Sequence, residues 1–313
     1  MASRFETNIL RQPELIGAVL DSPRPAWMAR LRSRRVHFVG IGTSRHAAQI
    51  AECLWRRWVS PRAAAVHSFD FVRLPQPVAR GDAVVLLSHR GSKSFTVQAA
   101  AKARRLGAVT VAITGRGSRW RHRVDHRLET CEPEDTGAFT KSLTTTLAWI
   151  VRWIGEPGLE EGARRACARL PEGPAFPRVS AGTDLILLGD LEREWVARET
   201  ALKLQEAARL RARAFGLEEF LHGPRISAGP GSLAVAFGSP EPRWRAVLDY
   251  LKTIAVPAVV VEDSQTPAPA RWLSQLFWGQ RLTLSACRDL RRDPDSLRTE
   301  EPLYRPARKK LVL

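Results

Sequence analysis

A strand, a glycine turn and a helix occur in this order twice along the chain, and this repetition constrains the fold more than local propensity does. The first copy is the apolar run 36–42, followed by a helical pattern over 43–55. The second is the run 184–190, followed by a helical pattern over 195–210. The copies lie about 148 residues apart, which is typical of an internal repeat.

Further apolar runs have nearly the same offset, about 149 residues. They are residues 83–88 with 233–237, and 109–113 with 258–261. A helical pattern separates the two runs in each half, at 95–106 and 244–254. Because these runs do not alternate with polar residues, they are typical of strands buried on both faces of a parallel sheet. We therefore expect an α/β chain of two units, each a parallel sheet flanked by helices in a flavodoxin-like three-layer αβα arrangement.

Proline and glycine cluster at 156–158 and 171–177, on either side of a helical pattern. These clusters predict a domain division near residue 170. The expected organisation is an N-terminal helical segment (1–24), a first domain (25–170), a second domain (171–297) and a C-terminal tail (298–313).

Three turns in the first half combine glycine with hydroxyl or cationic side chains. They are Gly40-Ile-Gly-Thr-Ser44, Ser88-His-Arg-Gly-Ser-Lys93 and Glu134-Asp-Thr-Gly-Ala-Phe-Thr-Lys141. At the carboxyl ends of parallel strands, helix N-termini present unpaired N–H groups to ligands, so these turns predict a phosphate site. Thr43 or Ser44 could instead be an ordinary helix cap. The first turn lacks the third glycine and the acidic ribose partner of a dinucleotide site, so NAD binding is not expected.

Motifs over nearly the whole chain resemble the double-SIS (sugar isomerase) family, typified by the isomerase half of glucosamine-6-phosphate synthase. Residues 6–13 resemble the opening helix of the family, Gly40–Ser44 its first phosphosugar loop, and Phe139-Thr-Lys141 its Ser-Thr-Lys segment. The most specific matches are Glu199-Thr-Ala-Leu-Lys-Leu-Gln-Glu206, Glu218-Glu-Phe-Leu-His-Gly-Pro224, and Asp293-Pro-Asp295 with Arg298.

The resemblance implies two tandem SIS domains and a sugar phosphate held by the first. It places Glu206 where the family has the carboxylate that moves a proton between C1 and C2, Lys203 at the substrate-contacting lysine, and His222 at the imidazole that opens the sugar ring. The implied substrate-binding and phosphate-binding residues are Gly42, Thr43, Ser44, Ser88, His89, Arg90, Lys93, Glu134 and Ala138. In relatives the histidine reaches the neighbouring subunit, so a homodimer is implied; no cofactor or metal is expected.

Simpler interpretations exist for the same residues. Lys203 and Glu206 are spaced to form an i,i+3 ion pair on a solvated helix face. His222 precedes Gly-Pro and could be a loop histidine that donates to a carbonyl.

The chain also departs from the family. Arg90 and Lys93 replace two hydroxyl positions of the phosphate loop, Gln205 replaces a lysine, and Pro302 stands where the synthase carries a catalytic lysine. Guanidinium groups bind phosphate with two parallel hydrogen bonds, so the altered loop could hold a more highly charged ligand or obstruct the usual one. The glutaminase domain of the synthase has no counterpart in this sequence, so amide transfer is not expected of it.

The formal charge of +17 would suit a nucleic-acid partner. However, only seven of the 49 cationic residues are lysines, and the arginines are spread along the whole chain, as a GC-rich genome would also produce. Nucleic-acid binding is therefore not expected. Four cysteines without a CxxC pair, and no apolar leader or span, predict a cytoplasmic protein without a membrane segment.

Two hypotheses about function follow from the sequence. The first is an enzyme acting on a sugar 6-phosphate, as an aldose/ketose isomerase or as an amino-sugar phosphate deaminase or deglycase. The second is a non-catalytic phosphosugar sensor, favoured by Arg90, Lys93 and Pro302. The retained Glu206, Lys203 and His222 favour the enzyme.

Overall fold

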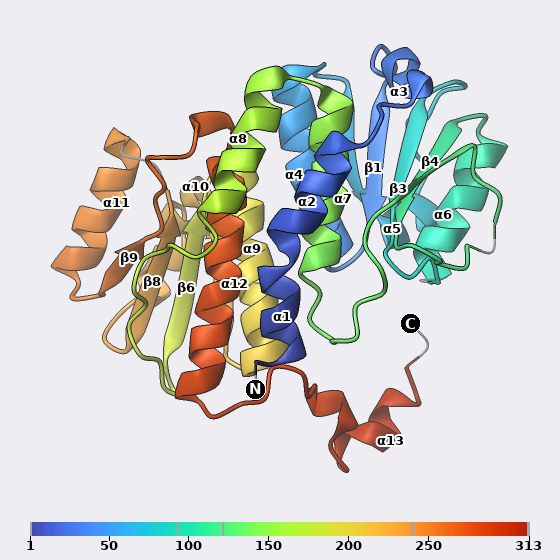
Figure 1. The fold of residues 1–313 in the computed structure, drawn as a ribbon. Helices are drawn as coiled ribbons and strands as arrows, with labels where there is room; N and C mark the ends of the chain where they lie inside the picture. The colour runs from blue at the N-terminus through green and yellow to red at the C-terminus, as the bar shows by residue number, and fades with distance from the viewer. Residues whose placement is uncertain (1, 93, 121, 239–240, 312–313) are drawn as a thin grey trace. The chain divides into compact units, whose positions relative to one another are not determined.

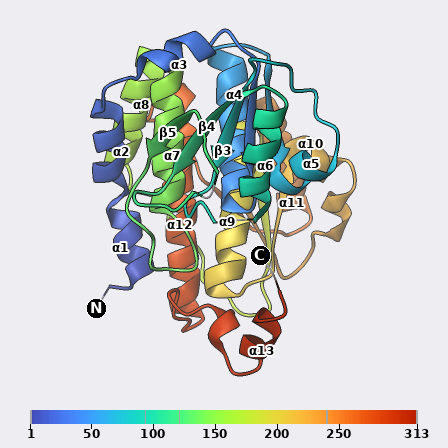
Figure 2. The same ribbon diagram turned by 90° about the vertical axis from the view of Figure 1, so that its right-hand side faces the viewer.

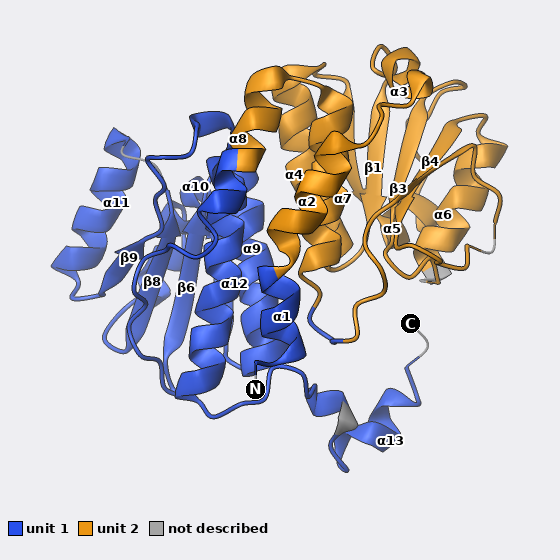
Figure 3. Ribbon diagram, in the orientation of Figure 1, with its two compact units in different colours: residues 1–10, 136–138, 165–312 blue, residues 11–135, 139–164, 313 orange. Residues whose placement is uncertain are grey.

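Two compact units make up the chain. The computed structural model describes residues 2–92, 94–120, 122–238 and 241–311. Unit 2 comprises residues 11–135, 139–164 and 313, and unit 1 comprises residues 1–10, 136–138 and 165–312 (Figure 3). No helix in the described part of the chain is long and apolar enough to cross a bilayer.

Unit 2 contains a five-stranded parallel sheet in the order β2-β1-β3-β4-β5. In Figure 2, β5, β4 and β3 follow one another in this order. The strands are β1 (Val36–Gly40), β2 (Ala63–His67), β3 (Ala83–Leu87), β4 (Val109–Thr114) and β5 (His126–Glu129). Every residue of β1 and β3 is buried, as expected for strands covered on both faces.

Helices cover both faces of this sheet (Figure 1). On one side are α4 (Thr43–Trp58) and α7 (Lys141–Ile154), with α2 (Gln12–Asp21) packed on α7. On the other are α5 (Ser68–Arg73) and α6 (Ser94–Arg105), whose Phe71 and alanines pack with Val39, Val84 and Leu86. Two further helices, α3 (Ala26–Leu31) and α8 (Pro157–Ala168), complete the helices of this part of the chain.

Unit 1 contains a four-stranded parallel sheet in the order β7-β6-β8-β9. Its strands are β6 (Asp184–Gly189), β7 (Ala212–Gly216), β8 (Ser232–Phe237) and β9 (Ala258–Val260). Its helices are α1 (Arg4–Leu10), α9 (Glu192–Lys203), α10 (Leu217–Leu221), α11 (Pro242–Thr253), α12 (Arg271–Asp289) and α13 (Tyr304–Arg308). A π-helical turn (Leu204–Ala208) follows α9, and short 3-10 turns lie at Pro224–Ser227, Ala268–Ala270 and Arg298–Glu300.

The N-terminal helix α1 belongs to unit 1 although most of the chain that follows it lies in unit 2. The amide groups of Arg4 and Phe5 donate to the Asp295 carboxylate at 2.7 and 2.8 Å. Glu6 accepts from the Arg288 guanidinium at 2.8 Å, which ties α1 to the end of α12. The tail beyond α12 leads to α13 (Figures 1 and 2).

The predicted fold class, α/β with parallel sheets flanked by helices, is confirmed, as are the three strands predicted in each half. Sequence patterns missed β2, β5 and β7, and all three are edge strands. An edge strand has one strand neighbour and keeps side chains near solvent, so it tolerates the alanines of β2 and the charges of β5. The pattern predicted a continuous helix to residue 210, whereas α9 ends at Lys203 and the π-helical turn follows.

The first strand of each sheet ends at a glycine that the following helix approaches closely. A Cβ added to Gly40 would lie 2.2 Å from the Ser44 carbonyl oxygen, and one added to Gly189 would lie 2.2 Å from that of Arg193. A side chain at either position would therefore push the helix away from the strand. This contact sets where the N-termini of α4 and α9 lie relative to their sheets.

The residue that precedes each of these helices has the same unusual backbone. Gly42 has φ 59° and ψ −134°, and Leu191 has φ 49° and ψ −125°. Glycine adopts this conformation freely, whereas a leucine is strained there. The Leu191 side chain is 60% exposed, so burial of the side chain does little to offset that strain.

We expect Leu191→Gly to raise the free energy of unfolding by about 1 kcal/mol, because glycine removes the strain. The reciprocal change Gly42→Ala should lower it by about 1 kcal/mol, because open space surrounds the new Cβ but φ remains positive. Urea unfolding followed by circular dichroism measures both. A loss of stability in Leu191→Gly would contradict the assignment of strain.

Candidate functional site

The loop after β1 brings Gly42, Thr43 and Ser44 to the carboxyl edge of the sheet in unit 2. Gly42 is the N-cap of α4, so Thr43 and Ser44 stand one and two residues beyond the N-cap position. Both residues lie in the first turn of α4, where amide N–H groups lack helical acceptors. The turn has the form of an anion-binding helix start.

The neighbouring loop after β3 begins with Ser88, which is 4% exposed. Its backbone is fixed, because its carbonyl accepts from the Thr114 hydroxyl at 2.7 Å and its amide donates to Ile113 at 3.2 Å. Its own hydroxyl is buried and has no hydrogen-bond partner in the described part of the chain. A buried hydroxyl without a partner is costly, so it is well suited to a ligand oxygen.

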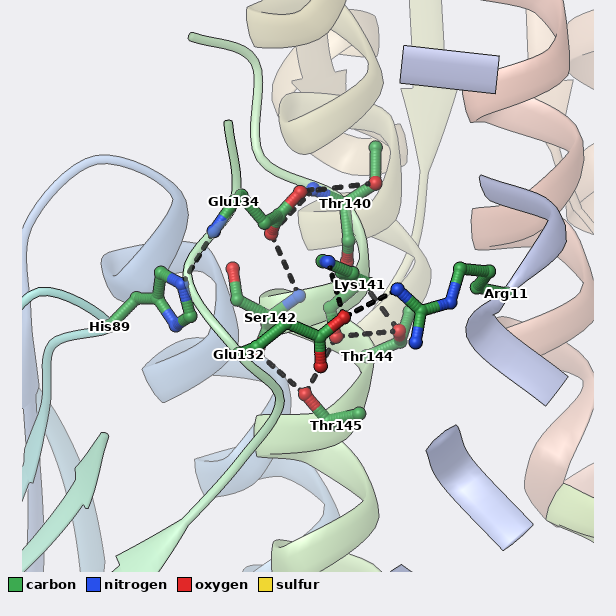
Figure 4. Close-up of polar contacts among 9 residues, drawn as sticks. All are labelled: Arg11, His89, Glu132, Glu134, Thr140, Lys141, Ser142, Thr144 and Thr145. Carbon is green, nitrogen blue, oxygen red and sulfur yellow. Dashed lines mark hydrogen bonds and ion pairs between the residues drawn. The ribbon is translucent and has the colours of Figure 1, made fainter. Parts of the chain in front are cut away.

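His89 lies beside Ser88 and is neutral at physiological pH. Burial, with a smaller effect of the nearby Arg90 and Lys141, lowers the pKa of its imidazole to about 4 against the opposing effect of Glu132. Nε2 accepts from the Glu134 amide at 3.2 Å, so Nδ1 carries the hydrogen (Figure 4). Among the described residues nothing accepts that hydrogen.

Glu134, predicted to bind phosphate, instead uses its side chain to hold the start of α7 (Figure 4). Its carboxylate accepts from the amides of Thr140 at 2.9 Å and Ser142 at 2.8 Å. The carboxylate therefore occupies the helix N-terminus that the sequence interpretation reserved for a ligand anion, and a second anion there would be repelled. Ala138 lies in the same segment, is buried, and its carbonyl accepts from the Thr136 hydroxyl at 3.1 Å.

A second polar cluster supports the first turn of α7. The Lys141 ammonium is buried and lies 2.9 Å from Glu132, which also pairs with Arg11 of the segment before α2 (Figure 4). Burial alone would raise the pKa of Glu132, but the bond to Lys141 and the contact with Arg11 lower it to about 2. Lys141 is therefore compensated by a carboxylate of its own unit.

Of the two cations that replace hydroxyls in the β3 loop, Lys93 lies outside the described residues. Arg90 is exposed, and its guanidinium lies over the Phe139 ring at 5.1 Å from the centroid. The unit thus brings Ser88, His89, Arg90 and Glu134 together, with Gly42, Thr43 and Ser44 at the same edge of the sheet.

In unit 1, Lys203 and Glu206 meet at the end of α9. The Lys203 ammonium is 1% exposed and lies 2.7 Å from Glu206 and 3.3 Å from Glu199. The expected i,i+3 pair therefore forms, but not on a solvated face, because the lysine is buried. Burial alone would lower the pKa of Lys203, yet Glu199 and Glu206 together raise it.

Glu206 lies within the π-helical turn, and its side chain is about one-third exposed while its partner Lys203 is buried. The Arg209 amide donates to the Leu204 carbonyl five residues earlier, and Arg209 itself has a left-handed backbone with φ 55°. Single π-helical turns are frequent at functional sites. The carboxylate is therefore held on one side by a buried cation and is open on the other.

His222 lies at the end of α10 with a side chain that is 79% exposed. Among the described residues, its polar contact is with Glu218 of the same helix, at 3.6 Å. No contact of His222 with Lys203 or Glu206 is therefore seen among the described residues. Its exposure leaves it accessible to another molecule.

Sequence reasoning missed two carboxylates that hold these sites, Glu199 and Glu132. Glu199 stands four residues before Lys203, and this spacing was a signal for a second partner on the same helix face. Glu132 lies nine residues from Lys141 across a loop, so no periodic spacing indicated that pair.

Among the described residues no group of three or more His, Cys, Asp or Glu side chains is arranged to hold a metal ion.

Comparisons with known proteins find a domain family for part of the chain. Residues 31–152 match the family model of the SIS domain. An isomerizing glutamine–fructose-6-phosphate aminotransferase of Pyrobaculum aerophilum is 30% identical over 244 residues, which are 69% of this chain and 40% of that protein. The Aquifex aeolicus protein of the same name is 26% identical over 237 residues, with the same two shares. The chain thus spans about 40% of the length of these relatives.

Solved structures share the fold over nearly the whole chain. The C-terminal domain of glucosamine-fructose-6-phosphate aminotransferase from Francisella tularensis superposes with a TM-score of 0.78 at 15% identity, covering 95% of this chain and 98% of that one. Tagatose-6-phosphate ketose/aldose isomerase from Escherichia coli gives 0.73 at 18% identity, with 96% and 97% covered. Glucosamine-6-phosphate deaminase from Thermotoga maritima gives 0.71 at 18% identity, with 96% and 98% covered. At these identities the likeness concerns the fold.

We expect Lys203→Met to lower the free energy of unfolding by about 3–5 kcal/mol, because it removes the buried ammonium that lies 3.3 Å from the buried Glu199 carboxylate. The double variant Glu199→Gln/Lys203→Met should recover most of this loss. Lys252→Met, an exposed position on α11, is the matched control and should change stability by less than about 0.5 kcal/mol. Equal losses at Lys203 and Lys252 in urea unfolding would rule out the buried triad.

The low pKa of His89 predicts a pH dependence of stability. The folded state does not bind the proton until pH falls to about 4, whereas the unfolded state binds it near the ordinary histidine pKa of 6.5. The contribution of His89 is therefore present above pH 6.5 and decreases as pH falls from 6.5 to about 4. We expect the stability difference between the wild type and His89→Gln to shrink between pH 7 and pH 5 in parallel urea titrations. A constant difference would show that His89 is not buried in its neutral form.

Proposed function

We propose that the chain is a phosphosugar-binding protein of two tandem SIS domains, at residues 25–170 and 171–297. The match of residues 31–152 to the SIS model supports the first domain. The second sheet, β7-β6-β8-β9, has the strand order of the first four strands of the first sheet, which supports the second domain.

The proposed activity is proton transfer between C1 and C2 of a sugar 6-phosphate, as in an aldose/ketose isomerase or an amino-sugar phosphate deaminase or deglycase. The main support for this activity is the position of the Glu206 carboxylate, which pairs at 2.7 Å with the buried Lys203 and is open on its other side. The related folds named above are an aminotransferase, an isomerase and a deaminase of sugar 6-phosphates.

In this mechanism Glu206 acts as a single base that serves two adjacent carbons. It removes the proton from C2 while the carbonyl oxygen at C1 takes a proton, which gives an enediol. The same carboxyl group then returns the proton to C1, and the hydroxyl at C2 gives up its proton as the carbonyl forms there, which balances the proton gained by the oxygen at C1. One carboxylate within reach of both carbons is the requirement for this reaction. Lys203 holds that carboxylate in place.

The proposed phosphate site is the carboxyl edge of the first sheet, formed by Gly42, Thr43, Ser44, Ser88, His89 and Arg90, with Lys93 and the backbone near Ala138. The Ser88 hydroxyl without a protein partner and the first turn of α4 supply hydrogen-bond donors. The side chain of Glu134 orders the start of α7 beside this site.

His222 is proposed to open the sugar ring in the site of a second copy of the chain. Its 79% exposure within one chain supports this role, since a ring opener for a partner must project outward. The corresponding assembly is a homodimer, with twice the 34.9 kDa mass of one chain in sedimentation equilibrium. A monomer at catalytic concentrations would contradict it.

A non-catalytic sensor is the second candidate, and specific residues favour it. Arg90 replaces a hydroxyl of the phosphate loop, and Pro302 stands where a catalytic lysine is implied by the resemblance. A sensor would keep saturable binding of the phosphosugar without chemistry at C1 or C2.

Incubation in deuterated water with fructose 6-phosphate, glucose 6-phosphate, tagatose 6-phosphate and glucosamine 6-phosphate separates the two candidates. We expect deuterium at C1 or C2 of one of them by NMR, and a loss of at least about 100-fold in the rate of labelling in Glu206→Gln. Glu262→Gln, an exposed carboxylate of the same unit, is the matched control and should label normally. Saturable binding without any label would establish the sensor instead.

A further inference from the structure

Unit 2 contains a cavity of about 550 Å³ beside the proposed phosphate loop. It lies between the loop that follows β3 and the loop that follows β4, and its lining includes His89, Arg90, Arg116, Arg119 and Trp120. Gly42, Thr43, Ser44 and Ser88 are not among the residues that line it. The cavity therefore adjoins the phosphate site proposed above: the two share His89 and Arg90, and the cavity extends from them to the loop after β4.

Three arginines line this cavity, and the structure gives them no carboxylate partner among the described residues. Within the described residues, none of Arg90, Arg116 and Arg119 forms an ion pair, and Arg90 only lies over the Phe139 ring. The acids closest to His89 are already engaged, Glu132 by Lys141 and Arg11 and Glu134 by the start of α7. Like charges around one cavity repel each other, and a bound anion would remove that repulsion.

Two further residues of the lining, His89 and Trp120, each carry an N–H donor without an acceptor. The Trp120 indole packs on the Gly91 backbone, where an added Cβ would lie 3.0 Å from Nε1. That Nε1 is buried and has no acceptor among the described residues, and neither has His89 Nδ1, which carries the imidazole hydrogen. Three arginines and two unpaired N–H donors favour a ligand rich in acceptors, such as a phosphate group.

The rigidity of the two loops supports a preformed site. The His89 carbonyl accepts from the Gly115 amide at 2.9 Å, and the Thr114 hydroxyl bonds to Ser118 at 2.7 Å. The volume exceeds what one phosphate needs and falls within the range of pockets that hold small organic molecules.

We propose that this three-arginine cavity binds a dianionic phosphate group carried by a small organic molecule. The phosphate has two possible sources. It is either the second phosphate of a bisphosphorylated sugar whose other phosphate occupies the Ser88 loop, which rests on the proposed function, or a phosphate of a separate effector such as a nucleotide.

Calorimetric titration of the full chain with inorganic pyrophosphate tests the site directly. We expect saturable binding, at least about tenfold weaker in Arg116→Gln/Arg119→Gln, because a bond between a guanidinium and a phosphate is charge-assisted. Arg105→Gln removes an exposed cation of α6 outside the cavity and should leave the affinity unchanged. Absence of binding by the wild type, or equal weakening in the Arg105 control, would overturn the proposal, the latter because it would show attraction by the net charge alone.

Two further titrations identify the source of the phosphate and keep the two proposals apart. If fructose 1,6-bisphosphate displaces both pyrophosphate and fructose 6-phosphate, the cavity holds the second phosphate of a substrate. If ATP displaces pyrophosphate while fructose 6-phosphate still binds, the cavity is an effector site. Pyrophosphate binding without any sugar-phosphate binding would support the cavity and contradict the proposed function, whereas the reverse would contradict the cavity alone.

Discussion

Every strand in both sheets is parallel, and a parallel pair cannot be joined by a tight turn. The chain must cross over one face after each strand, so helices cover both faces and the central strands β1 and β3 are buried along their whole length. The same requirement brings the ends of successive strands to one edge of the sheet. The loops that begin at Gly40 and Ser88 are neighbours for this reason, and their donors could converge on one ligand. The location of the candidate phosphate site is a consequence of strand direction.

Cationic side chains in the two units fall into two groups, those that are buried beside carboxylates and those that are exposed without a carboxylate partner. Where a cation is buried, as at Lys203 and Lys141, carboxylates stand within hydrogen-bonding distance and hold it. Burial of such ions is tolerable only with this compensation. The arginines around the β3 and β4 loops are exposed and have no carboxylate partner in the described residues. The contrast separates cations that maintain the fold from cations that are available to a ligand.

Much of this architecture follows from the sequence, because the central strands are apolar runs and the turns after them contain glycine. The edge strands β2, β5 and β7 could not be predicted in this way, because an edge strand is partly exposed and its sequence need not be an apolar run. Lys203 and Glu206 could be paired from spacing alone. The capping role of Glu134 could not, because it depends on a loop that folds back on the start of α7. The orientation of His222 likewise depends on where α10 ends and not on any local pattern.

The π-helical turn at Leu204–Ala208 contains one residue more than an α-helical turn of the same height. Each residue of an α-helix advances the chain by about 100° around the axis, so deletion of one residue here would restore regular α-helical bonding and rotate Arg209 and the following strand β7 relative to α9. Glu206 would then lose either its place beside Lys203 or its open side. Related chains should therefore gain or lose this carboxylate geometry through insertion or deletion of a single residue, a change that a comparison of residue types at aligned positions would overlook.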